Sequence, residues 1–112
     1  HLMALSEVCL SMGDHAATLA HALELPKLYP KVGMADHQAA FYVAQCVPLA
    51  AKDPALTPPQ RLQSAELYSK QAVGLLRQAI ANGYKDAAEL PKWKAFAPLL
   101  ARPDFRALIP QK

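Results

Sequence analysis

The side chains of this chain that could bind a metal ion or act as a general base are its histidines. His15 and His21 lie six residues apart on one expected helix, so they do not share a face, and no cluster of carboxylates joins them. His37 directly follows Asp36, which we expect to be the N-cap of another helix. These positions favour surface or capping histidines over a metal site or a catalytic base.

The serines and cysteines carry no stronger signal of catalysis. Ser64 and Ser69 lack a paired base nearby in the sequence pattern, so hydrolase chemistry is not indicated. Cys9 and Cys46 fall inside apolar helical patterns, which favours buried free thiols in a reducing cytosol over a structural disulfide. No Cys-x-x-Cys or Cys/His spacing suggests zinc. We therefore expect no catalytic residue, no cofactor and no bound metal ion.

The C-terminal half mixes cations with aromatic rings, as nucleic-acid-binding proteins do. Residues 59–112 carry nine Lys and Arg against four acidic residues, whereas residues 1–58 carry three against five. The side chains concerned are Tyr84, Lys85, Lys92, Trp93, Lys94, Phe96, Arg102, Phe105 and Arg106. The same rings are needed to close the end of a helical stack, and a buried ring cannot stack on a base. Binding of nucleic acid or another acidic partner is therefore the alternative function, and a protein partner is favoured.

Composition limits the fold that could position these groups. A chain of 112 residues suffices for one small domain with a modest core. Ala and Leu dominate while Val, Ile and Thr are sparse, which favours helix over sheet. The longest apolar run, residues 39–51, is interrupted by Gln45 and Pro48 and is too short to span a bilayer. Because the chain opens within an apolar pattern, we expect a fragment of a longer cytoplasmic protein without membrane contact.

The longest expected helix covers residues 58–82, and local signals mark both of its ends. Thr57 is the predicted N-cap, Gln60 can complete a capping box, and Gly83 is the expected left-handed stop. Its apolar stripe consists of Leu62, Ala65, Tyr68, Ala72, Leu75, Leu76, Ala79 and Ile80. We expect it to pack antiparallel to a helix over residues 35–52, which starts at Asp36 and continues through a kink at Pro48. These two helices form a second, longer helix pair over residues 35–83.

A shorter helix pair, residues 2–30, is expected to precede it. Its helices run over residues 2–12 and from His15 to about Leu25, with Asp14 as the N-cap of the second. A loop then extends from Pro26 to Pro30.

Residues 84–112 are expected to form a C-terminal cap of short helices. The first is a one-turn helix, Asp86–Glu89, with capping-box spacing and a stop at Pro91. Further short pieces cover residues 92–101 and 104–109. We expect the large apolar side chains of the cap to be buried, with Trp93 and Phe105 as core residues. The full set is Trp93, Phe96, Leu99, Leu100, Phe105, Leu108 and Ile109.

The helix pairs resemble tetratricopeptide repeats (TPRs). The large, large, small and large positions of the first repeat helix correspond to Leu2, Leu5, Ser6 and Cys9. The small, medium, small and proline positions of the second correspond to Thr18, Ala22, Leu25 and Pro30. In the later pair, part of the spacing recurs at Ala72, Leu76 and Ala79.

Most of the chain also resembles the C-terminal TPR-type region of planctomycete serine/threonine protein kinases. The resemblance is carried by FYVAQCVPLA (41–50), YSKQAVGLLRQAIANGYKDAA (68–88) and RPDF (102–105). Residues 92–101 differ, because they are more basic and aromatic than the aspartate-rich segment usual in that family. The resemblance implies an upstream kinase domain. Since no Gly-rich loop, His-Arg-Asp or Asp-Phe-Gly motif occurs here, we expect this chain itself not to be an enzyme.

The sequence therefore predicts an all-α fold, with antiparallel helix pairs stacked as a short TPR-like α-solenoid in one domain, residues 1–112. The predicted function is a non-catalytic protein–protein interaction or scaffold module that binds a protein or peptide. We also expect two copies to form a homodimer through the N-terminal helix pair, where a repeat stack would leave apolar side chains uncovered. Those side chains are Leu5, Val8, Leu19 and Leu23.

Overall fold

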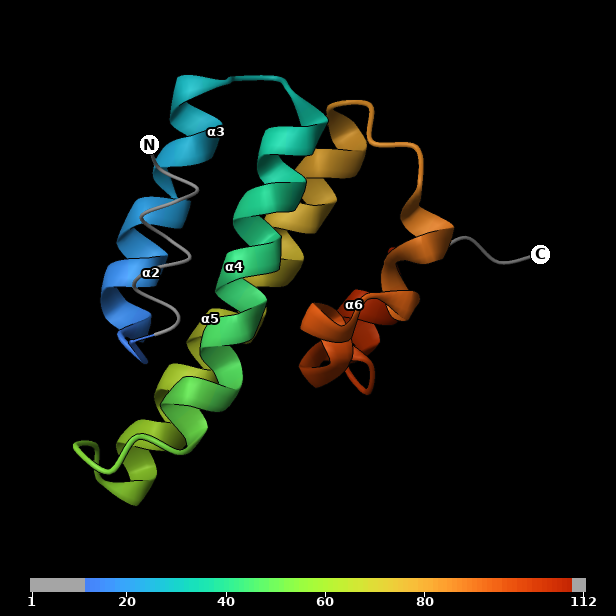
Figure 1. Cartoon of the computed structure of the whole chain (residues 1–112). Helices are drawn as coiled ribbons and strands as arrows, with labels where there is room; N and C mark the ends of the chain where they lie inside the picture. The colour runs from blue at the N-terminus through green and yellow to red at the C-terminus, as the bar shows by residue number, and fades with distance from the viewer. Residues whose placement is uncertain (1–11, 110–112) are drawn as a thin grey trace.

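The computed structural model describes residues 12–109, and every regular element in this range is a helix (Figure 1). The α-helices are α2 (His15–Ala22), α3 (Glu24–Leu28), α4 (Gly33–Ala51), α5 (Pro58–Ala81) and α6 (Pro103–Arg106). The 3-10 helices are η1 (Ala87–Lys92) and η2 (Lys94–Leu99). The all-α prediction is confirmed for these residues. The helix expected over residues 2–12, with Cys9 and two of the four residues of the proposed dimer surface, lies outside the described residues; the other two, Leu19 and Leu23, are partly buried against the core.

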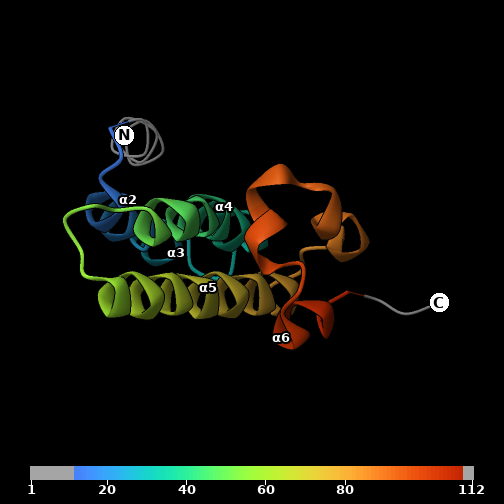
Figure 2. The same ribbon diagram turned by 90° about the horizontal axis from the view of Figure 1, so that it is seen from below.

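Helices α4 and α5 form the most extensive interface of the molecule and lie side by side (Figure 1). α2 and α3 lie on one side of this pair and the cap on the other, as Figure 2 also shows. Small side chains let the two long helices approach closely, and larger ones fill the space between the elements. The largest fully buried apolar side chains are Tyr42, Phe96, Phe105, Leu76, Leu90, Leu99, Val43 and Val73. None of the helices in residues 12–109 has the length and apolar character needed to cross a membrane.

Both predicted ends of α5 are confirmed. The Thr57 hydroxyl accepts a hydrogen bond from the Gln60 amide at 3.3 Å, and the Gln60 side chain accepts one from the Thr57 amide at 2.9 Å. This is the capping box that the local sequence predicts. At the other end Gly83 adopts a φ of +98°, the left-handed conformation that glycine tolerates best.

The predicted apolar stripe of α5 is wrong at its N-terminal end. Leu62 is 75% exposed, and the buried residues of the helix begin only at Tyr68. Leu62 therefore fits the periodicity of the apolar stripe but lies outside the closely packed part of α5, and Ala65 is only partly buried.

The second correction concerns Asp36, which does not cap α4. The helix begins earlier, at Gly33, and Val32 occupies the N-cap position without a side-chain hydrogen bond. Asp36 is buried inside the first turns, where its carboxylate accepts a hydrogen bond from the Asn82 side chain at 2.8 Å. The bond connects the start of α4 to the end of α5. As predicted, α4 continues through Pro48.

The N-terminal part differs from the prediction after α2. Asp14 caps α2 as expected, because its carboxylate accepts a hydrogen bond from the Ala17 amide at 3.0 Å. The helix ends at Ala22, however, and α3 covers the end of the predicted helix and the start of the predicted loop, with Pro26 inside it. Proline is tolerated there because the first amides of a helix have no intrahelical acceptor.

The cap is built from short helices, but their predicted boundaries are wrong. η1 continues through Pro91, Asp86 makes no side-chain capping bond, and α6 covers residues 103–106 rather than 104–109. Phe105 is buried as predicted, whereas Trp93 is 39% exposed and is not a full core residue, and Leu100 is 40% exposed, contrary to the prediction.

Candidate functional site

His15 is a buried histidine, which contradicts the prediction of a surface or capping role. Its Nδ1 lies 2.6 Å from the Tyr68 hydroxyl and its Nε2 lies 2.8 Å from the Asp53 carboxylate. Since a carboxylate can only accept, Nε2 donates to Asp53, and in the neutral ring Nδ1 accepts from Tyr68. The hydrogen bond from His15 lowers the pKa of Asp53, and burial raises the pKa of Tyr68.

This His15 cluster (His15, Asp53 and Tyr68) connects the start of α2 to the α4–α5 loop and to α5. A histidine between a carboxylate and a hydroxyl is also the arrangement that activates a nucleophile in hydrolases. Tyr68 is only 5% exposed, so its hydroxyl is closed to substrate. The Cys46 thiol donates a weak hydrogen bond to the His15 carbonyl at 3.5 Å, and burial raises the pKa of this free thiol to about 12. The cluster therefore positions α2 on the two long helices.

His37 is the second buried histidine and also contradicts the predicted surface or capping role. Its ring stacks on Tyr84, with 4.7 Å between the ring centroids, and meets the Trp93 and Phe96 rings edge-on at 4.8 and 5.7 Å. Neither ring nitrogen has a hydrogen-bond partner among the described residues. Burial lowers the pKa of His37, and the negative charge of Asp86 opposes this effect.

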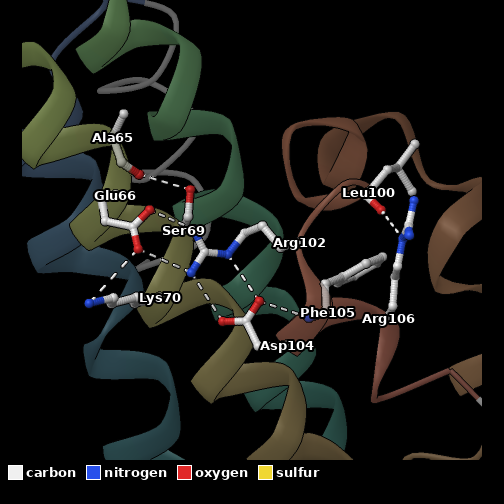
Figure 3. A network of polar contacts seen from close by, with 9 residues as sticks. All are labelled: Ala65, Glu66, Ser69, Lys70, Leu100, Arg102, Asp104, Phe105 and Arg106. Atoms are coloured by element: carbon white, nitrogen blue, oxygen red, sulfur yellow. Dashed lines mark hydrogen bonds and ion pairs between the residues drawn. The ribbon is translucent and has the colours of Figure 1, made fainter.

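The Arg102-Pro-Asp-Phe string attaches the cap to α5 (Figure 3). Arg102 donates to both carboxylate oxygens of Glu66, at 2.7 and 3.2 Å, and its Nε donates to Asp104 at 3.0 Å. These contacts lower the pKa values of Glu66 and Asp104 and raise that of Arg102. Because the guanidinium is saturated by two carboxylates, Arg102 is an anchor of the cap rather than a site for an anionic ligand.

A hollow that could receive a ligand is an open groove between α4 and η2, with a volume of about 440 Å³. We call it the α4–η2 groove. Its walls are formed by Ala44, Gln45, Pro48, Leu49, Lys94, Ala95, Ala97 and Pro98. A second hollow of about 310 Å³ shares Pro48 and Leu49 and extends the surface to Gly13, Lys52 and Asp53.

The α4–η2 groove is apolar in its walls and positively charged at its margins. Lys94 and Lys52 are exposed, and neither forms an ion pair with a residue in the range 12–109. The side-chain amide of Gln45 donates a hydrogen bond to the Phe41 carbonyl of the same helix at 3.1 Å. Asp53, at the far end of the second hollow, is engaged by His15 and by the Ala55 amide. The α4–η2 groove therefore offers apolar contact and one lysine, Lys94, without an ion-pair partner among residues 12–109, whereas Lys52 shares the second hollow with the Asp53 carboxylate.

Sequence patterns did not reveal this groove. Pro48 and Pro98 could be recognised as helix-breaking residues, but nothing local indicates that they line the same hollow.

The described residues contain no other arrangement that suggests catalysis or metal binding. The Ser69 hydroxyl donates a hydrogen bond to the Ala65 carbonyl. Within residues 12–109 no group of three His, Cys, Asp or Glu side chains is placed to hold a metal ion. Comparisons with protein-family models, with curated proteins and with solved structures found no match to this chain.

Proposed function

We propose that this chain is a non-catalytic interaction module that binds a short acidic peptide segment of a partner protein in the α4–η2 groove. The observation that carries the proposal is the open apolar groove with Lys94, which forms no ion pair within residues 12–109, in its wall; Lys52 lines the second hollow together with Asp53. Apolar walls bind aliphatic side chains through the hydrophobic effect. Lysines without an intramolecular partner select a ligand with negative charges on either side of those side chains.

The form of the groove supports a peptide over a small molecule. Its volume lies within the range of about 300–1,000 Å³ that ligand pockets occupy. However, it is open, continues into the second hollow past Pro48 and Leu49, and has few convergent polar groups. An extended or helical segment can use such a surface along its length, as peptides do in the grooves of helical proteins.

The proposal includes the TPR-like arrangement and the kinase context implied by the resemblance. In support, Thr18, Ala22 and Leu25, which fall at repeat positions, are buried. The start of α4 also lies beside the end of α5, as in an antiparallel helix pair. In the parent protein we propose that this region recruits a partner to an upstream serine/threonine kinase domain. The nucleic-acid alternative is less well supported, because Phe96 and Phe105 are buried and cannot stack on bases, although Trp93 is 39% exposed.

The test is fluorescence anisotropy with two pools of short labelled peptides. In one pool, pairs of leucines three or four residues apart are flanked by aspartates; in the other, the same leucines are flanked by lysines. We expect the acidic pool to bind at least about tenfold more tightly, and the difference to shrink in high salt. Equal affinity for the two pools, or binding of neither, would contradict the proposal.

A matched pair of variants locates the binding surface. Ala97 and Ala101 are both exposed and lie four residues apart, but only Ala97 lines the α4–η2 groove. We expect Ala97→Glu to abolish binding of the acidic pool, because it places a carboxylate in the groove, and Ala101→Glu to retain it. Retained binding by Ala97→Glu would show that the partner binds elsewhere.

A further inference from the structure

The contact that holds η2 against α4 is centred on His37. Trp93 precedes η2 directly and Phe96 lies within it, and both rings pack edge-on against the His37 ring. The residues between and beside them, Lys94, Ala95 and Ala97, form one wall of the α4–η2 groove. The position of this wall therefore depends on the ring cluster around His37. We call this set, His37 with Tyr84, Trp93 and Phe96, the His37 cluster.

The His37 cluster fits the neutral imidazole and not the charged one. His37 is 0% exposed, and both of its nitrogens lack a partner among the described residues. An imidazolium carries two N–H donors and a full charge, and burying these without acceptors is costly. The face of Tyr84 attracts a cation, but a contact of this kind offsets only part of the free energy lost when a charge leaves water.

The charged groups around His37 do not reverse this preference. Asp86, on the segment after α5, is the charged residue that raises the pKa of His37. Its effect is weaker than that of burial, which lowers this pKa. At η2 the His37 ring contacts the aromatic rings of Trp93, which directly precedes this helix, and Phe96, and neither ring carries a charge. On α4 itself, the neighbouring Asp36 is hydrogen-bonded to Asn82. Within the range 12–109, burial and the charge of Asp86 account for the shift in the pKa of His37, without a contribution from α2, α3 or α5.

We propose that His37 makes the α4–η2 groove responsive to pH: the neutral ring keeps η2 docked on α4, and protonation of His37 releases η2 and removes one wall of the groove. The release of η2 is a property of the fold alone. Its effect on peptide binding rests on the function proposed above.

The direction and size of the effect follow from proton linkage. In the released state His37 is exposed and has its ordinary pKa of about 6.5, whereas in the docked state burial lowers this pKa. The released state therefore binds more protons, and docking weakens as the pH falls below about 6.5. The docking equilibrium constant can change by at most tenfold per pH unit, and it changes mainly below about pH 6.5. We therefore expect this constant to fall by up to about tenfold between pH 7.5 and 5.5.

Amide hydrogen exchange of the intact chain measures this release. The Phe96, Leu100 and Arg102 amides donate to the Trp93, Ala97 and Leu99 carbonyls of the cap. After correction for intrinsic rates, we expect their protection factors to fall up to about tenfold from pH 7.5 to 5.5, while those in the middle of α5 stay constant. An equal fall in α5 would indicate global unfolding and overturn the proposal, as would unchanged protection in η2.

Variants separate His37 from the other titrating groups. His37→Phe keeps an aromatic ring in the cluster and cannot be protonated, so we expect the pH dependence in η2 to disappear. His21→Gln on α2 is the matched control and should retain it. If His37→Phe does not fold, an NMR titration of wild-type His37 decides instead: a pKa at or above about 6.5 overturns the proposal. Asp86→Asn removes the opposing charge and should extend the loss of protection to lower pH.

The two proposals fail in different ways. Exchange is measured without peptide, so pH-dependent release of η2 with no binding of the acidic pool would refute the interaction function alone. Binding of that pool, with protection in η2 that does not change with pH, would refute the His37 mechanism alone.

Discussion

Replacing each of two helical glycines by alanine should change stability in opposite directions. Gly74 lies in the middle of α5, where an added Cβ would meet no atom within 4 Å. Gly33 is the first residue of α4, where the same Cβ would lie 2.9 Å from the Ala79 carbonyl oxygen and 2.9 Å from the Tyr84 amide nitrogen. The sequence alone marks Gly33 only as a loop residue. Its structural role is to let the start of α4 approach the end of α5.

The magnitudes follow from helix propensity and from steric overlap. Gly74→Ala should increase the free energy of unfolding by about 0.5–1 kcal/mol, because alanine loses less backbone entropy in a helix. At Gly33 the two atoms that would clash are fixed, since the Tyr84 amide donates to the Ala79 carbonyl at 2.9 Å. α4 must therefore move away, which weakens the Asp36–Asn82 hydrogen bond. Overpacking of this kind costs about 1–3 kcal/mol.

Urea unfolding followed by far-UV circular dichroism tests both variants under the same conditions. We expect the midpoint to rise for Gly74→Ala and to fall for Gly33→Ala, with similar m values. A Gly33→Ala protein at least as stable as the wild type would refute the close approach of α4 and α5 at this point. A destabilised Gly74→Ala protein would instead mean that Gly74 has a packing role that the structure does not contain.

Three further predictions concern the core, the free thiol and the helix cap. Leu76→Ala should cost about 2–5 kcal/mol of unfolding free energy, whereas Leu62→Ala on the exposed part of the same helix should cost less than about 0.5 kcal/mol; similar costs would contradict the observed packing. In a Cys9→Ser background, Cys46 should react with a thiol reagent only on unfolding, because burial raises its pKa to about 12; rapid reaction of the native protein would contradict this. Thr57→Ala should cost about 1 kcal/mol in the same urea assay, and an unchanged midpoint would argue against the capping box.

Features of this fold that depend on nearest neighbours could be predicted from the sequence. The capping box at Thr57, the N-cap at Asp14 and the left-handed Gly83 all involve atoms within a few residues of one another. The choice of helix over strand is of the same kind, because it follows from composition and periodicity. The TPR-like stacking, the kinase context and the homodimer involve residues beyond the described chain or comparisons that found no match, and they stay predictions.

Errors arose where a residue's role depends on a segment far away in the sequence. Periodicity placed Leu62 on the apolar face of α5 correctly in phase, but could not show that the covered part of that face begins at Tyr68. Asp36 has the identity of an N-cap, and only the position of Asn82 makes it a buried hydrogen-bond acceptor instead. Trp93 is predicted in the core with Phe105, yet it is 39% exposed although its ring contacts those of His37 and Phe41.

The sequence by itself determined an all-helical chain, the ends of its longest helix and the lack of familiar catalytic motifs. The tertiary structure alone decided which side chains share an environment. His15 meets Tyr68, 53 residues away in the chain, and His37 meets the rings of the cap, so both histidines become buried. Likewise, Pro48 and Pro98 line one groove only because η2 folds back onto α4. Burial and electrostatic environment are properties of surfaces brought together in space, and local sequence patterns carry no information on which surfaces will meet.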